Sequence, residues 1–211
     1  MIYLFDLDGT LADSLGVWEK IDADIISLHE KHADRDELRN MASLGYEQLY
    51  ELLGSMGIKY PSVAAMQDEI DQMAQLYYAG KVQLRPYARQ LLQKCTQKGI
   101  VLLFTDSPER LYMPLLERYG LSGCFERMIC AREAGLDKKK PASYTRLADM
   151  LGARTSDFVF YDDSPACVSA AGEAGMYTVG VCDDIRGIKK EEFDGKCDRI
   201  IYGWEEEWKC I

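Results

Sequence analysis

The sequence predicts an α/β fold, a parallel sheet flanked by helices, with an all-helical domain inserted near the N-terminus. Short apolar runs recur along the chain, and turn residues and helical patterns alternate with them. These runs lie at 2–5, 100–104, 158–161, 177–181 and 199–202. Because they are apolar at nearly every position, we expect strands that are covered on both faces, as in a parallel sheet.

Helical spacing between the runs predicts the crossover helices. Apolar residues three or four positions apart stop before Gly99 and again before Gly152, and glycine is common where a helix ends. Another helix is expected to start at Ser164 and Pro165, because serine caps helices and proline suits their first turn. Pro114 interrupts an apolar pattern, so we place it in the first turn of a restarted helix.

The segment from 15 to 82 breaks this alternation. It has helical periodicity and no convincing strand. Since the first strand still needs a parallel partner, we expect an α/β core of residues 1–14 and 83–211. Residues 15–82 then form a helical domain on the face where the strands end.

Composition and charge exclude several classes of protein. The 211 residues are 47% hydrophobic and 28% charged, as in globular proteins rather than disordered ones. The formal net charge of -10 is opposite in sign to what binding of nucleic-acid phosphates requires. The seven cysteines include no closely spaced pair, so reduced thiols are expected. With no basic leader and no long apolar run, we expect a cytoplasmic protein without nucleic-acid or membrane partners.

Acidic and hydroxyl side chains follow three of the predicted strands. Asp6 and Asp8 come at the end of the first strand, Thr105 ends the next, and Asp162 and Asp163 follow a third. Because the carboxyl ends of parallel strands meet at one edge of a sheet, these side chains should converge. Carboxylates that close to one another need a cation or a proton between them.

Each feature taken alone has an ordinary structural explanation. An Asp-x-Asp pair can be a turn, a threonine a cap, and the run Lys138–Lys140 a solvated turn before Pro141. Together they describe a crevice with two carboxylate pairs, a hydroxyl and a lysine. Oxygen ligands without histidine or cysteine favour Mg²⁺, and the whole set suits an anionic phosphoryl group.

The order and spacing of these motifs resemble the haloacid dehalogenase superfamily. The closest likeness is to the branch with a helical C1-type cap after the first motif, which includes phosphoglycolate-phosphatase-like and beta-phosphoglucomutase-like enzymes. The first motif, Phe-Asp-Leu-Asp-Gly-Thr-Leu-x-Asp-Ser, is highly specific, and the later motifs match at Thr105, Lys140-Pro141 and Asp162-Asp163-Ser164. The resemblance spans nearly the whole chain and implies a Rossmann-like core with a helical cap.

The resemblance also implies a role for each motif residue. Asp6 would be the nucleophile that forms an aspartyl-phosphate, and Asp8 the general acid and base. Mg²⁺ would be held by the Asp6 carboxylate, the Asp8 main-chain carbonyl and Asp163, with Asp162 helping directly or through water. Thr105 and Lys140 would bind the phosphoryl group. Lys140 is chosen among the three lysines because it alone directly precedes the proline.

Three departures from the family pattern matter. Asp106, predicted beside the phosphate, stands where a neutral asparagine is common and adds a negative charge unless its side chain turns away. Cys167 stands where a second acid often follows the fourth motif. In the cap, Trp18 and Lys20 replace a histidine that is typical of mutases, and the next stretch lacks the arginine that mutases use for a second phosphate. That stretch, where we expect substrate choice to lie, comprises Leu44, Gly45, Tyr46 and Glu47.

The sequence therefore predicts a Mg²⁺-dependent phosphatase that acts on a small-molecule phosphate ester, with the cap closing to exclude water. One alternative is a sugar phosphomutase of the beta-phosphoglucomutase type. Another is a catalytically silent phospholigand-binding protein, against which the intact motif residues argue, since a silent member would be free to lose at least one.

Other candidate residues are given structural roles. His29 and His32 are expected on the surface of the cap, because no third ligand accompanies them. Trp204 and Trp208 are expected to cover the sheet edge. Arg85 marks the return of the chain to the core, where a hinge role is favoured over catalysis.

Overall fold

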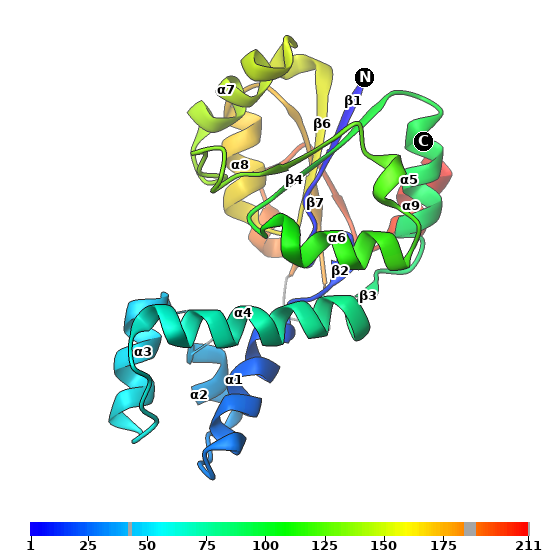
Figure 1. Cartoon of the computed structure of the whole chain (residues 1–211). Coiled ribbons are helices and arrows are strands. Elements are labelled where there is room, and N and C mark those ends of the chain that lie inside the picture. The colour runs from blue at the N-terminus through cyan, green and yellow to red at the C-terminus, as the bar shows by residue number, and fades with distance from the viewer. Residues whose placement is uncertain (42–43, 184–188, 211) are drawn as a thin grey trace. The chain divides into compact units, whose positions relative to one another are not determined.

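Figure 1 shows a computed structural model of the chain, which describes residues 1–41, 44–183 and 189–210. The chain forms two compact units. One, called here the core unit, comprises Met1–Asp13 and Gln83–Ile211, and the other, the helical unit, comprises Ser14–Val82.

The core unit is built on a six-stranded sheet in which all neighbouring strands are parallel. The order is β5-β4-β1-β6-β7-β8, and the predicted α/β class is thereby confirmed. The strand bounds are β1 Ile2–Phe5, β4 Ile100–Thr105, β5 Arg127–Cys130, β6 Phe158–Asp162, β7 Tyr177–Val181 and β8 Arg199–Ile201. β1 lies between β4 and β6, so the carboxyl ends of these three strands are neighbours at one edge of the sheet.

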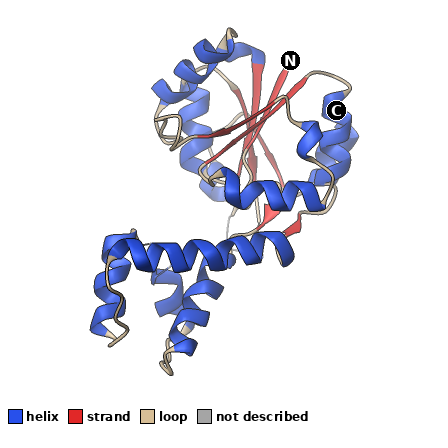
Figure 2. Ribbon diagram, in the orientation of Figure 1, coloured by secondary structure: helices blue, strands red, loops and turns tan. Residues whose placement is uncertain are grey.

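Helices cover both faces of this sheet. Figure 2 shows them in blue around the red strands, with α7 and α8 on one side and α5 and α9 on the other, as labelled in Figure 1. Both faces are therefore apolar, which explains why the strands lack polar alternation. The helices of the core unit are α5 Ala88–Thr96, α6 Glu109–Arg118, α7 Pro141–Leu151, α8 Pro165–Glu173 and α9 Trp204–Cys210.

The predicted helix boundaries are confirmed at α7 and α8 and wrong at α6. Gly152 ends α7 in the left-handed conformation, and the Ser164 hydroxyl accepts a hydrogen bond from the Cys167 N–H at the start of α8. Pro114, by contrast, lies inside a continuous α6. The proline removes one helical hydrogen bond there, but the fully buried Leu111 and Leu115 on either side hold the helix against the core.

The chain passes between the units through a short antiparallel pair. β2, Ala12–Asp13, pairs with β3, Gln83–Leu84, and both belong to the core unit. Each strand is only two residues long, which leaves no periodic pattern for the sequence to show.

The helical unit consists of α1 Val17–Leu28, α2 Arg35–Met41, α3 Tyr46–Ser55 and α4 Val63–Gly80. Its described residues contain no strand, as the periodicity predicted. α1 and α4 pack on each other, and Ile21 and Ile25 of α1 and Ile70 of α4 are buried. None of the helices described in either unit has both the length and the apolar character needed to cross a bilayer.

Candidate active site

Three carboxylates gather at the carboxyl ends of two adjacent strands. Asp6 directly follows β1, Asp162 is the last residue of β6, and Asp163 comes next. One carboxylate oxygen of each lies within 4.8 Å of those of the other two. All three side chains are buried, with Asp162 only 1% exposed. The structure thus brings together acids that are more than 150 positions apart in the sequence, because their strands are neighbours.

The lysine that meets these carboxylates is Lys138. Its Nζ lies 2.5 Å from Asp6 Oδ1 and 2.7 Å from Asp162 Oδ2, and its side chain is only 4% exposed. The Lys140 side chain is 72% exposed and pairs with Asp137 at 3.4 Å. The prediction that Lys140 joins the site is therefore wrong.

Local geometry explains the correction. Lys140 is the residue before Pro141 and the N-cap of α7, a position that leaves its side chain in solvent. Burial alternates along the preceding segment, where Leu136 and Lys138 are buried and Asp137 is exposed. This burial pattern arises in the folded turn before α7, and the lysine run itself does not show which of its members is buried.

The cluster carries an excess of negative charge. Burial raises the pKa of Asp6 to about 7, with Lys138 opposing the rise and Asp162 and Asp8 adding to it. Burial also raises the pKa of Asp163 well above its ordinary value. For Lys138, burial alone would lower the pKa, but Asp162 and Asp6 together raise it. Three carboxylates and one ammonium suit an additional cation, and hard oxygen donors fit Mg²⁺.

Hydrogen bonds of Thr10, in the loop after β1, link the first acidic motif to Asp163 of the second. Gly9 has a φ of 82°, a left-handed conformation that glycine adopts without strain, and its N–H donates to the Ala12 carbonyl. The next residue, Thr10, is fully buried, and its hydroxyl accepts a hydrogen bond from the Asp163 N–H at 3.0 Å. The same hydroxyl donates to Asp163 Oδ1 at 3.3 Å. Thr10 therefore fixes Asp163, a link that the sequence did not reveal.

Asp8 and Thr105 are connected through Ser107. The Ser107 hydroxyl donates to Asp8 Oδ2 at 2.6 Å, and its N–H donates to Thr105 Oγ1 at 3.0 Å. Thr105 ends β4 and is fully buried, whereas Asp8 is partly exposed. Sequence reasoning did not assign Ser107 a role, although its place two residues after the strand-end threonine is a usable signal.

Asp106 does not join this arrangement. Its side chain is exposed, and none of the contacts found among the described residues connects that side chain to the acids or to Lys138. The structure gives its predicted phosphate-binding role no support.

The Cys167 side chain is buried beside Asp162 and Lys138. Burial raises the pKa of its thiol to about 12, while Asp162 adds to the rise and Lys138 opposes it.

The residues expected to set substrate choice lie in the helical unit. Gly45 precedes α3, and its N–H donates to Gln48 Oε1 at 3.3 Å. The Tyr46 hydroxyl donates to Asp71 Oδ1 at 3.3 Å, Glu47 is exposed and Leu44 is partly buried. Their role in specificity stays a prediction.

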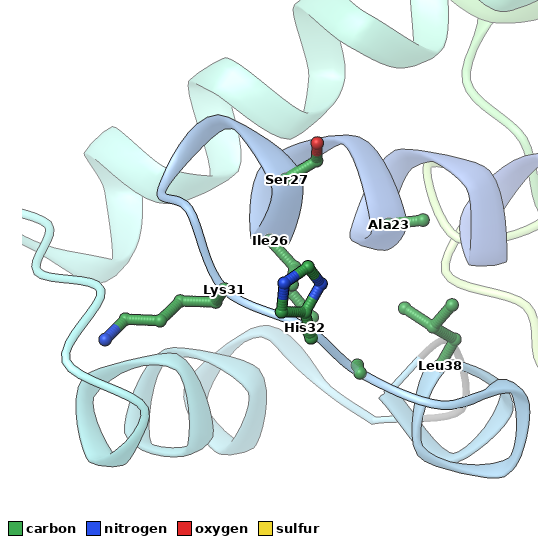
Figure 3. A pocket seen from close by; sticks show the side chains of 7 residues that line it. Ala23, Ile26, Ser27, Lys31, His32 and Leu38 are labelled. Carbon is green, nitrogen blue, oxygen red and sulfur yellow. The ribbon is translucent and has the colours of Figure 1, made fainter.

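The helical unit also contains a small pocket of about 140 Å³, shown in Figure 3. Its lining is mostly apolar, and His32 lies beside Ile26 while the Lys31 side chain extends away from it. His29 and His32 are both exposed, as the sequence predicts. The pocket therefore offers no convergent set of polar groups.

Comparison with known proteins identifies the family. The family model of haloacid dehalogenase-like hydrolases matches residues 1–175 of the chain. The chain belongs to this family. The matched residues include the three clustered acids, Lys138 and the hydroxyl residues Thr10, Thr105 and Ser107, so the family resemblance seen in the motifs is confirmed.

Several related proteins carry the name of one enzyme. The phosphoglycolate phosphatase of Pseudomonas fluorescens (strain Pf0-1) is 29% identical over 186 residues, 85% of this chain and 68% of that protein. The phosphoglycolate phosphatase of Pectobacterium atrosepticum is 28% identical over 84% of this chain and 78% of its own length. Together with the family, these relatives identify the chain as an enzyme, a phosphatase of the phosphoric monoester hydrolase class.

Solved structures share the fold. A Thermotoga maritima protein named "putative beta-phosphoglucomutase" superposes with a TM-score of 0.84 at 20% identity, covering 99% of this chain and 97% of its own. The haloacid dehalogenase-type protein YfnB from Bacillus subtilis, solved with bound magnesium, gives a TM-score of 0.79 at 14% identity, with coverage of 99% and 97%. At these identities the likeness shows the fold alone.

Proposed function

We propose that the protein is a Mg²⁺-dependent phosphatase that hydrolyses a small phosphorylated metabolite through an aspartyl-phosphate on Asp6. One observation carries the proposal: the buried Asp6 carboxylate is paired with Lys138 and lies within reach of two further acids. The names of the relatives make phosphoglycolate the first substrate to test.

The donor set indicates which residues would hold Mg²⁺. Both oxygens of Asp162 already have protein partners, since Oδ1 accepts from the Ser164 N–H at 2.7 Å and Oδ2 pairs with Lys138. Asp6 and Asp163 are therefore the favoured carboxylate ligands, with the Asp8 carbonyl as the backbone ligand. Bound Mg²⁺ would supply charge neutralisation for the phosphoryl oxygens.

The chemistry would proceed in two displacements at phosphorus. In the first, an Asp6 carboxylate oxygen forms a bond to phosphorus while the ester P–O bond breaks, and the Asp8 carboxyl gives its proton to the leaving alcohol oxygen. In the second, Asp8 takes a proton from water, the water oxygen bonds to phosphorus, and the acyl P–O bond breaks. Free phosphate leaves and Asp6 is restored.

The surrounding residues would orient these groups. Lys138 opposes the rise in the pKa of Asp6 that burial causes, and so favours the ionised form that attacks. Ser107 holds Asp8 by its hydroxyl, which fixes the side chain that transfers the proton. The Thr105 hydroxyl, which accepts a hydrogen bond from the Ser107 N–H, would contact a phosphoryl oxygen.

The nucleophile is tested by trapping the covalent intermediate. With phosphoglycolate labelled in its phosphoryl group, acid quench should give labelled wild-type protein whose label hydroxylamine removes. Asp6→Asn should carry no label and lose at least about 10⁴-fold in kcat. Asp149→Asn, an exposed change on α7, is the matched control and should label normally. Undiminished turnover by Asp6→Asn would refute the assignment.

The same assay separates hydrolysis from mutase chemistry. A sugar monophosphate is supplied in a parallel reaction, and both inorganic phosphate and rearranged sugar phosphate are measured. Release of phosphate without an isomerised product supports the phosphatase. An isomerised product that forms through a bisphosphorylated sugar would replace that proposal with the phosphomutase.

A further inference from the structure

Residues outside the loop between Asp8 and Ala12 hold it in place by donating hydrogen bonds to its carbonyl groups. Arg85 Nη1 donates to the Gly9 carbonyl at 2.6 Å, and the Arg85 N–H donates to the Leu11 carbonyl at 2.8 Å. Between them, Trp204 Nε1 donates to the Thr10 carbonyl at 2.9 Å. Three consecutive carbonyls thus accept hydrogen bonds from residues far away in the sequence. The conformation of this loop is therefore not set by the loop alone.

Trp204 also packs behind both acidic motifs. Its side chain is 1% exposed and meets the rings of Phe5 and Tyr161 edge-on, with ring centroids at 5.8 and 5.6 Å. Phe5 directly precedes Asp6, and Tyr161 directly precedes Asp162. The two rings stack on each other at 4.6 Å. One indole therefore contacts the residues that precede two of the clustered acids.

Helix α9 fixes the position of this indole. Glu207 accepts a hydrogen bond from the Tyr161 hydroxyl at 2.7 Å and pairs with Arg199 at 2.8 Å. One residue further along the helix, Lys94 Nζ donates to the Trp208 carbonyl at 2.6 Å. These contacts tie α9 to β6, β8 and α5, so the indole N–H is held in a fixed direction toward Thr10.

We propose that Trp204 is a positioning residue, whose N–H holds the Thr10 carbonyl so that the Thr10 hydroxyl fixes Asp163. The inference rests on the proposed function, in which Asp163 is a ligand of Mg²⁺. It concerns a part of the chain beyond residue 175, where the family match ends. Trp204 does not cover the sheet edge as its sequence context predicts, because its ring packs against Phe5 and Tyr161 on the two central strands that carry the acids.

The test removes the N–H and keeps an aromatic ring. For Trp204→Phe we expect the dissociation constant for MgCl₂, measured by calorimetric titration without substrate, to rise about tenfold. Replacing a residue that orients a metal ligand typically weakens metal binding to about that extent. kcat should fall by about tenfold with little change in KM, because substrate binding is not what the N–H supports. Trp208→Phe, on the same helix and 37% exposed, is the matched control.

A second variant covers the case in which Trp204→Phe fails to fold. Replacing Trp204 by 3-benzothienylalanine exchanges the N–H for sulfur and keeps the bicyclic shape, so the packing against Phe5 and Tyr161 survives. Weaker Mg²⁺ binding by this protein at an unchanged thermal midpoint supports the inference. Wild-type affinity and kcat, with only the midpoint lowered, would show a purely structural role and overturn it.

The outcomes also separate this inference from the proposed function. If the wild-type protein binds no Mg²⁺, the proposed function fails and the inference falls with it. If the wild-type protein binds Mg²⁺ and releases phosphate while the variants do so equally well, the inference alone fails.

Discussion

The two units of the molecule each bury a carboxylate whose pKa is about 7, but they surround it differently. In the core unit, Asp6 is paired with Lys138 and lies beside further acids. In the helical unit, burial raises the pKa of Asp22 to about 7, and Glu19 adds repulsion to it. A raised pKa alone therefore does not identify a catalytic site. What distinguishes the core unit is the Lys138 ammonium and the hydrogen-bond donors arranged around its acids.

Two nearby lysines provide the sharpest test of this difference. Lys138→Met should lower kcat by about 10³-fold, because it removes the only positive charge in contact with Asp6 among the described residues. It should also lower the free energy of unfolding by about 3 kcal/mol, since it breaks a buried ion pair from one side. Phosphate release and denaturant unfolding measure the two effects.

Lys140→Met is the matched control for this change. Its side chain is 72% exposed and pairs only with Asp137 in the contacts of the described residues, so kcat should change less than about twofold. A large loss of activity in Lys140→Met, with Lys138→Met active, would restore the assignment made from the sequence.

Mg²⁺ should stabilise the protein through the acids of the core unit. At a concentration about 100 times its dissociation constant, the free energy of unfolding should rise by about 2.7 kcal/mol, and a chelator should reverse the change. Asp163→Asn should abolish this response, whereas Asp22→Asn should keep it. Thermal unfolding with and without MgCl₂ makes the measurement, and an equal response from both variants would contradict the site.

The smallest expected effect belongs to Asp22. Its pKa is about 7 in the folded protein and 3.8 ordinarily, so between these pH values the folded state holds a proton that the unfolded state has lost. Its contribution to stability is present below pH 4 and is lost as the pH rises through 7. Asp22→Asn should therefore be more stable than the wild type at pH 8, by about 2 kcal/mol, and equal to it at pH 4. Urea unfolding across this range checks the sign, and parallel curves for the two proteins would contradict it.

The sequence predicted the parts of the fold that have strong local patterns. β1, β4, β6 and β7 are continuous apolar runs, and their topology was enough to bring the acidic motifs together. β5 was missed because it is a short edge strand, Arg127–Cys130, that begins with an exposed residue. β2 and β3 were missed because two residues show no alternation.

The residues that the sequence did not identify depend on tertiary contacts. Lys138 and Lys140 belong to one lysine run, and only the turn before α7 decides which of them is buried. Ser107 acts through a hydrogen bond to Asp8, 99 positions earlier in the chain. Trp204 reaches Thr10 because α9 packs on α5 and β6. No periodicity in the sequence could show where that short helix packs.

The order of strands in the sheet has a consequence for how the enzyme is made. β1 leaves the ribosome before both of its neighbours in the sheet, β4 and β6, which come much later in the chain. During translation, the apolar side chains of β1 therefore stay exposed until β4 and β6 have been synthesised. Chaperones commonly shield such segments during this period. The loop after β1 gains the hydrogen bond to its Thr10 carbonyl only when Trp204 has been synthesised, so catalytic competence should appear only after α9 has left the ribosome.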